Sequence, residues 1–178
     1  MTSQLIDSYA AEERPDVLTL LVDIGKGTDP VPVADIMDIL DDTDDYDITV
    51  VAIDTLVMRF DDVREAITGG LYQDSSEYVR ELMILVCVES QRSLGMQFVL
   101  SEYFFNPHMR PTIRQLAFKD KRVLLVNLMR FMQDCELTSE TVEVAQQLLT
   151  TIPRDVVLSM SDKMAATVLM DIYYAMPK

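Results

Sequence analysis

The stretch LDDTDDYDITVVA at residues 40–52 is echoed 31 positions later by LYQDSSEYVRELM at residues 71–83. Each stretch begins with a leucine, passes through a polar turn, and continues with small or apolar residues at every fourth position. A spacing of four places these side chains on one face of a helix, whereas a strand would show alternation. The pair therefore predicts a repeated unit that consists of a turn and a helix with one buried face.

A third segment, LTSETVEVA at residues 137–145, repeats the scheme, although strict periodicity fails between residues 90 and 136. Over residues 30–90 and 115–175 the pattern resembles the HEAT- and armadillo-type helical repeats. Arg80 stands where such repeats carry an arginine, and Thr49 takes its place in the first unit. The resemblance implies short helical hairpins stacked as an array. A compact orthogonal helical bundle is the alternative, because it produces the same local patterns.

Apolar residues are spaced by three and four from Val17 to Tyr174, with glycine and proline at the breaks, which predicts an all-α protein. We expect about eight helices of roughly 8–18 residues. The run Ile48-Thr49-Val50-Val51 could be a strand, but the helical pattern continues to Phe60. Six residues on apolar stripes are predicted to lie in the core: Leu56, Met83, Ile84, Val86, Leu125 and Leu128.

Composition predicts a soluble globular protein with a single all-helical domain over residues 1–178. The chain is 49% hydrophobic and 25% charged, so intrinsic disorder is disfavoured. Its longest uninterrupted apolar run, residues 82–88, is far shorter than the ~20 residues of a membrane span. Two cysteines make no disulfide framework and favour the cytoplasm or another reducing compartment. We expect Cys87 to be a buried free thiol.

Charge divides the chain into two parts. Residues 1–74 hold 18 acidic and four basic residues, a formal charge of −14, whereas residues 75–178 carry −1. This uneven distribution of charge indicates that the two parts of the surface present different electrostatic potentials. It disfavours direct binding of nucleic acid, whose phosphates the acidic part would repel.

No motif for a cofactor or metal is recognised, and we predict neither. The acidic turn, residues 41–47, lacks the glycine and glutamate of a calcium loop; we expect Asp45 or Asp47 to cap the next helix, with weak cation binding left open. His108, the only histidine, is expected in an exposed loop. The sequence GKGT at residues 25–28 lacks the upstream glycine and the strand of a phosphate loop, so it is interpreted as a helix-ending turn.

A basic cluster lies between residues 110 and 130 and is the first candidate surface for a partner. Arg110 and Arg114 are four apart and would share a helix face. The cluster would dock an acidic protein, or it would neutralise the acidic half or simply solvate a helix. Its members are Arg110, Arg114, Lys119, Lys121, Arg122 and Arg130.

The second candidate surface is the C-terminal segment with Tyr173 and Tyr174, where a terminal helix without a polar face would contact another protein or a second copy of the chain. These features favour a non-catalytic adaptor or scaffold subunit of a larger assembly. Two alternatives remain. One is a regulatory bundle that binds a helix in a groove, as apoptosis-regulator-like or viral proteins do. The other is a small metal-dependent enzyme that uses acidic residues.

Overall fold

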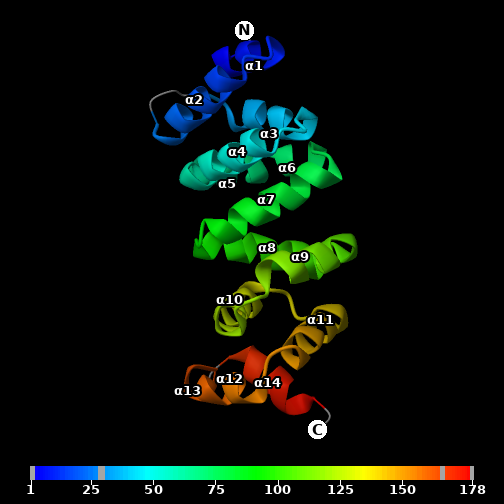
Figure 1. The fold of residues 1–178 in the computed structure, drawn as a ribbon. Coiled ribbons are helices and arrows are strands. Elements are labelled where there is room, and N and C mark those ends of the chain that lie inside the picture. Colours follow the sequence, from blue (N-terminus) through cyan, green and yellow to red (C-terminus); the bar gives the residue numbers. More distant parts are fainter. Residues whose placement is uncertain (1–2, 28–30, 165–166, 177–178) are drawn as a thin grey trace. The chain divides into compact units, whose positions relative to one another are not determined.

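The computed structural model describes residues 3–27, 31–164 and 167–176, and every regular element in these ranges is helical (Figure 1). The predicted all-α class is confirmed, and the run that could have been a strand lies inside α4. In order, the elements are α1 (Gln4–Ala10), α2 (Arg14–Gly25), α3 (Val33–Asp42), α4 (Tyr46–Met58), α5 (Phe60–Thr68), α6 (Leu71–Asp74), α7 (Glu77–Glu89), α8 (Ser93–Phe105), a 3-10 turn η1 (Pro107–Met109), α9 (Arg110–Ala117), α10 (Lys121–Asp134), α11 (Ser139–Thr150), α12 (Arg154–Ser159), α13 (Ser161–Met164) and α14 (Val168–Ala175).

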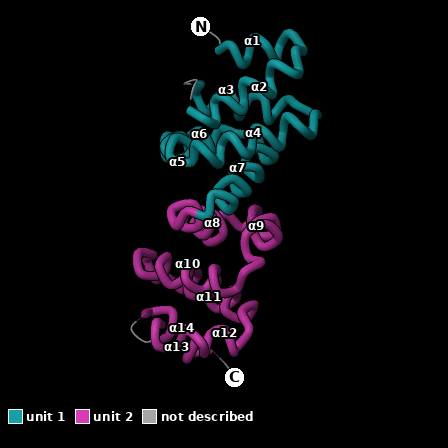
Figure 2. Tube along the Cα trace, turned by 60° about the vertical axis from the view of Figure 1, so that its left-hand side comes forward, with its two compact units in different colours: residues 1–91 teal, residues 92–178 magenta. Residues whose placement is uncertain are grey.

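The chain forms two compact units, residues 1–91 (unit 1) and 92–178 (unit 2) (Figure 2). The single domain that we expected over residues 1–178 stays a prediction, and the boundary between the two units lies after residue 91, beyond the charge boundary at residue 74. Helix α7 packs on α3 and α4, so its three glutamates belong to the acidic part. Unit 1 therefore holds 21 acidic and five basic residues, a formal charge of −16, whereas unit 2 carries +1.

Unit 1 is built from helices that contact each other in two rows. Helix α4 packs between α2 and α7, while α3 contacts both α1 and α5. Contacts of α1 with α2, of α3 with α4 and of α6 with α7 join the rows. Each helix thereby covers the apolar face of its neighbours.

The three segments that share a sequence pattern also share a helix register. Their N-cap residues are Asp45, Ser76 and Thr138, at intervals of 31 and 62 residues, and each cap side chain accepts a backbone N–H of the first turn. The residues three, seven and eleven positions after each cap are buried. In α4 they are Ile48, Ala52 and Leu56; in α7, Val79, Met83 and Cys87; in α11, Thr141, Ala145 and Leu149. Local sequence thus sets where each helix begins and which face it buries.

The predicted core is confirmed, since all six residues named from the apolar stripes have 0% exposure. The described residues form fourteen α-helices, more than the eight expected. Much of the difference lies in short helices: the apolar spacing between Val156 and Tyr174 falls on three of them, α12, α13 and α14, with residues 165–166 outside the described part.

Unit 2 is organised around α8 and α10. Helix α8 contacts α9, η1 and α10, and α10 also contacts α12 and α14, while α11 packs on α14. Tyr103 of α8 is fully buried, with its ring centroid 5.0 Å from that of Phe118 and 6.4 Å from that of Phe104. Within the described ranges, none of the helices combines the length and the apolarity needed to cross a membrane.

Candidate functional site

The acidic turn connects α3 to α4 and is fixed by its own side chains. The Asp45 carboxylate accepts the backbone N–H groups of Asp47 and Ile48 at 2.9 and 3.2 Å, so Asp45 caps α4 as one of the two predicted candidates. Thr43 accepts the N–H of Asp45 at 3.1 Å. The described residues contain no group of three or more histidine, cysteine, aspartate or glutamate side chains placed to hold a metal ion.

Arg14, near the start of α2, ties the acidic turn to the rest of unit 1. Its Nε donates to Asp45 at 2.5 Å, and its Nη2 donates to both Asp45 and Asp47. The guanidinium, together with the Ile48 and Asp47 N–H groups, lowers the pKa of Asp45, and the two carboxylates raise the pKa of Arg14. Because the pKa of Asp45 is lower in the folded state, this contact stabilises the fold at neutral pH. The contribution is lost as pH falls through that lowered pKa.

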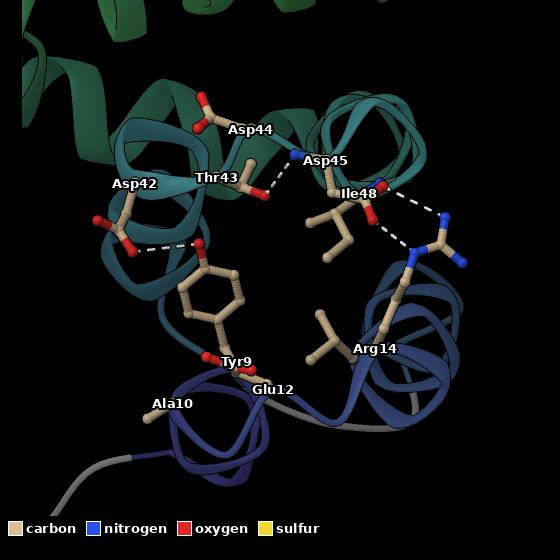
Figure 3. Close-up of a pocket in the computed structure, with 10 residues that line it drawn as sticks. Tyr9, Ala10, Glu12, Arg14, Asp42, Thr43, Asp44, Asp45 and Ile48 are labelled. Atoms are coloured by element: carbon tan, nitrogen blue, oxygen red, sulfur yellow. Dashed lines mark hydrogen bonds and ion pairs between the residues drawn. The ribbon is translucent and has the colours of Figure 1, made fainter.

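A hollow of about 410 Å³ opens between α1, α2 and the acidic turn (Figure 3), and we name it the first hollow. Its lining combines two nearly buried apolar side chains, Val17 and Ile48, with several acidic ones. The Tyr9 hydroxyl donates to Asp42 at 3.2 Å along one side, and Arg14 meets Asp45 on the opposite side. Partial burial raises the pKa of Tyr9, so its hydroxyl stays protonated and keeps donating at neutral pH. The full lining is Tyr9, Ala10, Glu12, Arg14, Val17, Asp42, Thr43, Asp44, Asp45 and Ile48.

A second hollow of about 480 Å³ lies on the other side of the acidic turn, toward the start of α7. Two exposed aromatic side chains line it, Tyr46 with 78% of its surface exposed and Tyr78 with 47%. Ser76, which caps α7, donates to Asp41 of the turn and so joins the two helix starts. Thr43 and Asp44 line both hollows. The acidic turn is thus the shared wall of two adjacent recesses.

Two members of the predicted basic cluster, the half-buried Arg110 and the exposed Arg114, are bound by their side chains to α8 of unit 2. Arg110 donates to the carbonyls of Tyr103 and Phe104 at 2.9 and 3.0 Å, where it satisfies the last turn of α8. Arg114 donates to the Tyr103 hydroxyl at 2.7 Å, and both guanidinium carbons lie within 6 Å of the Tyr103 ring centroid. The two arginines share a helix face as expected, and that face packs on α8.

The remaining docking candidates lie at the surface of unit 2. Lys119 and Arg122 are exposed and Lys121 is half-buried, while Asp120 between them caps α10 by accepting two backbone N–H groups. Arg130 donates to Ser93 at 2.9 Å. Near the C-terminus, Tyr174 is 69% exposed and Tyr173 half-buried, with ring centroids 5.9 Å apart.

The cysteines and the histidine form no nucleophile–base pair in the part of the chain that the structure describes. Cys87 is fully buried as expected, and burial raises its pKa to about 12. Cys135 is partly exposed, with a pKa raised by burial and by Glu136. His108 is exposed in η1, so it lies in a short turn at the surface as expected.

We expect only one of the two thiols to react in the native protein. The thiolate is the nucleophile, so near pH ~8 the buried Cys87 stays protonated and shielded, whereas Cys135 reacts slowly. Titration with a disulfide reagent should give one equivalent in buffer and a second in guanidinium chloride. Replacing Cys135 with serine should abolish the equivalent that reacts in buffer. An equivalent that still reacts in buffer in this variant would contradict the assignment.

Comparison with known proteins gives no match to a family model, to a curated protein or to a solved structure. The candidate site therefore rests on its own geometry. Sequence reasoning located the acidic turn and its cap, but it missed both hollows. Each hollow requires residues from helices that are distant in the sequence, and no local pattern marks which of them meet.

Proposed function

We propose that this protein is a non-catalytic adaptor or scaffold subunit that holds another protein against exposed side chains of its helices. The observation that carries the proposal is the pair of exposed tyrosines, Tyr46 and Tyr78, that line one hollow. Tyrosine is enriched at protein interfaces, because its ring offers apolar area at low entropic cost while its hydroxyl forms hydrogen bonds. Single exposed apolar side chains are ordinary, but a pair lining a recess offers a partner a place to insert.

The packing of unit 1 supports a scaffold built from helical repeats. Three helices that contact in sequence, α2, α4 and α7, lie against a second row that contains α1, α3 and α5. Repeat arrays of the HEAT and armadillo type use such rows to present extended binding surfaces. We propose that unit 1 is a short array of this type, with the loops between its helices on the binding side.

The exposed part of the basic cluster supports a second docking surface on unit 2. Lys119 and Arg122 form no side-chain hydrogen bond or ion pair with other described residues, so both charges are available to an acidic partner. Arg110 and Arg114 would contribute less, since their donors already serve α8. Tyr173 and Tyr174 remain candidates for contact with a partner or with a second copy of the chain.

The experiment is to isolate the binding partner from the native source and then to rebuild the complex from the two purified proteins. We expect a stoichiometric complex that is weakened when one surface is altered. Tyr46→Ala with Tyr78→Ala tests unit 1, and Lys119→Glu with Arg122→Glu tests unit 2. Loss of two interface anchors typically raises Kd by about tenfold or more. Binding of the wild type through the basic residues should also weaken as salt rises, and its difference from the charge-reversed variant should shrink, because exposed charges are screened over ~8–10 Å.

Val22→Ala with Met58→Ala is the matched control for unit 1. Both residues are exposed apolar side chains, at 41% and 69%, and neither lines a hollow. This variant should bind like the wild type. If no stoichiometric complex can be rebuilt from purified proteins, the adaptor role is wrong. If both surface variants bind as tightly as the control, the complex forms elsewhere on the protein.

A further inference from the structure

The lining of the first hollow combines apolar and acidic side chains, and this combination suits one type of side chain of a partner. Its floor contains Val17 and Ile48, which are 1% and 5% exposed. Its rim carries four carboxylates and a tyrosine ring. Lysine and arginine have the matching shape, a long apolar stem that ends in a positive charge. The apolar floor would cover the stem and the rim would meet the charge.

The charges of the lining favour a cation over an anion. The lining includes a single basic residue, Arg14, and its guanidinium is already engaged by Asp45 and Asp47. Glu12 and Asp44, in contrast, have no hydrogen bond or ion pair to another described side chain. The surrounding unit carries −16, which attracts positively charged groups over long range. An anionic ligand would meet four carboxylates in the lining and would be repelled.

A metal ion fits this hollow less well than an organic cation. Its carboxylates are spread around the rim rather than gathered, and three of them never come together in the described part of the chain. A guanidinium or ammonium group does not need such close coordination, because it forms separate hydrogen bonds with several acceptors. The Tyr9 ring also offers a π face to a cation, which a lysine or arginine can use.

We propose that the first hollow recognises a lysine or arginine side chain within a basic segment of a partner protein. The inference rests on the proposed adaptor role and names the chemistry of its partner. The volume of about 410 Å³ accommodates one long side chain together with water. The second hollow, which shares Thr43 and Asp44 with the first, receives a neighbouring residue of the same segment against Tyr46 and Tyr78. The basic cluster of unit 2 was expected to bind an acidic partner, whereas the first hollow of unit 1 would bind a basic one.

The test uses a fluorescein-labelled hexapeptide of alternating arginine and glycine, and its counterpart with glutamate in place of arginine. Binding is followed by fluorescence anisotropy at low and at physiological salt. We expect the arginine peptide to bind and the glutamate peptide not to bind. In the double variant Glu12→Gln with Asp44→Asn, Kd should rise by about tenfold, since two exposed charge contacts are lost. Tyr9→Leu should raise Kd by about two- to fivefold through loss of the π face.

The matched control is Asp61→Asn with Glu65→Gln on α5, which removes the same two charges from the same unit at exposed positions that line neither hollow. Its Kd should change less than about twofold. Equal losses in the two double variants would mean that only the general field of unit 1 attracts the peptide, which overturns the proposal. Absence of binding by the arginine peptide, or equal binding of the glutamate peptide, would also overturn it.

The outcomes separate this inference from the adaptor role. A rebuilt complex that is insensitive to Glu12→Gln with Asp44→Asn leaves the adaptor role intact and makes the inference wrong. Site-specific peptide binding without any rebuilt protein complex supports the recognition of a cationic side chain and makes the adaptor role wrong. Each variant is checked by circular dichroism and thermal unfolding, and Tyr9→Gln, which also removes the π face, replaces Tyr9→Leu if Tyr9→Leu does not fold.

Discussion

Replacing Tyr103 with alanine is expected to lower the stability of unit 2 by about 3–5 kcal/mol, the cost of truncating a large buried aromatic side chain. The ring has 0% exposure and packs on Phe104 and Phe118. It also lies beneath the guanidinium groups of Arg110 and Arg114. Removing it opens a cavity between α8 and α9 and takes away the acceptor that holds Arg114.

Two control variants separate the ring from its hydroxyl and from general effects. Tyr103→Phe keeps the ring and loses the bond to Arg114, so it should cost about 1 kcal/mol, because the exposed Arg114 can turn to water. Tyr174→Ala truncates the same residue type at a position that is 69% exposed and should change stability by less than ~0.5 kcal/mol. The free energy of unfolding is measured by urea unfolding, and amide hydrogen exchange in α8 and α10 shows whether unit 2 is affected. Equal losses for Tyr103→Ala and Tyr174→Ala would show that Tyr103 is not a core residue.

Much of the secondary structure could be predicted because it depends on neighbours in the sequence. Capping chemistry and the apolar spacing that follows predict three helix starts: Asp45 or Asp47 before the first, Ser75 or Ser76 before the second, and a start at Ser139 for the third. The structure confirms Asp45 and Ser76 as caps, and it places Thr138 before α11. Buried faces followed for the same reason, since a residue four positions after a buried one in a helix lies on the same side.

The partners of the charged residues could not be predicted from the sequence. Arg110 and Arg114 were recognised as sharing a face, but a docking patch and an internal contact have the same local pattern. What decides between them is the position of Tyr103, which depends on the chain reversal at η1 after α8. The same limit applies to the hollows beside the acidic turn. Tyr9 and Asp42 are 33 residues apart and meet only because α1 packs on α3.

The boundary between the units was also beyond the sequence patterns. Charge density falls after Asp74, and that change was visible, but packing extends unit 1 through α7. The apolar face of α7 contains Val79, Met83 and Ile84, and contact with α3 and α4 covers it. Charge composition reflects the residues at the surface of a unit. The boundaries of the unit depend instead on which helices cover each other's apolar faces.

Replacing Leu56 with alanine is the corresponding test for unit 1, with an expected loss of about 2–5 kcal/mol. Leu56 is fully buried in α4, the helix that packs on both α2 and α7, so its truncation leaves a cavity between three helices. Its neighbour Thr55 donates to the carbonyls of Leu21 and Val51 at 2.8 Å and holds α2 close to α4. This close contact limits the collapse of the helices into the cavity, which favours the upper part of the range.

Met58→Ala is the matched control for Leu56→Ala, because it lies on the same helix, two residues away, with 69% of its surface exposed. Alanine at this position keeps helix propensity and removes little buried area, so stability should change by less than ~0.5 kcal/mol. Urea unfolding followed by circular dichroism, with amide exchange in α4 and α7, measures both variants. A loss in α4 protection for Leu56→Ala alone is expected. Similar losses for the two variants, or none for either, would show that α4 does not bury this face, and the register shared by α4, α7 and α11 would then be wrong.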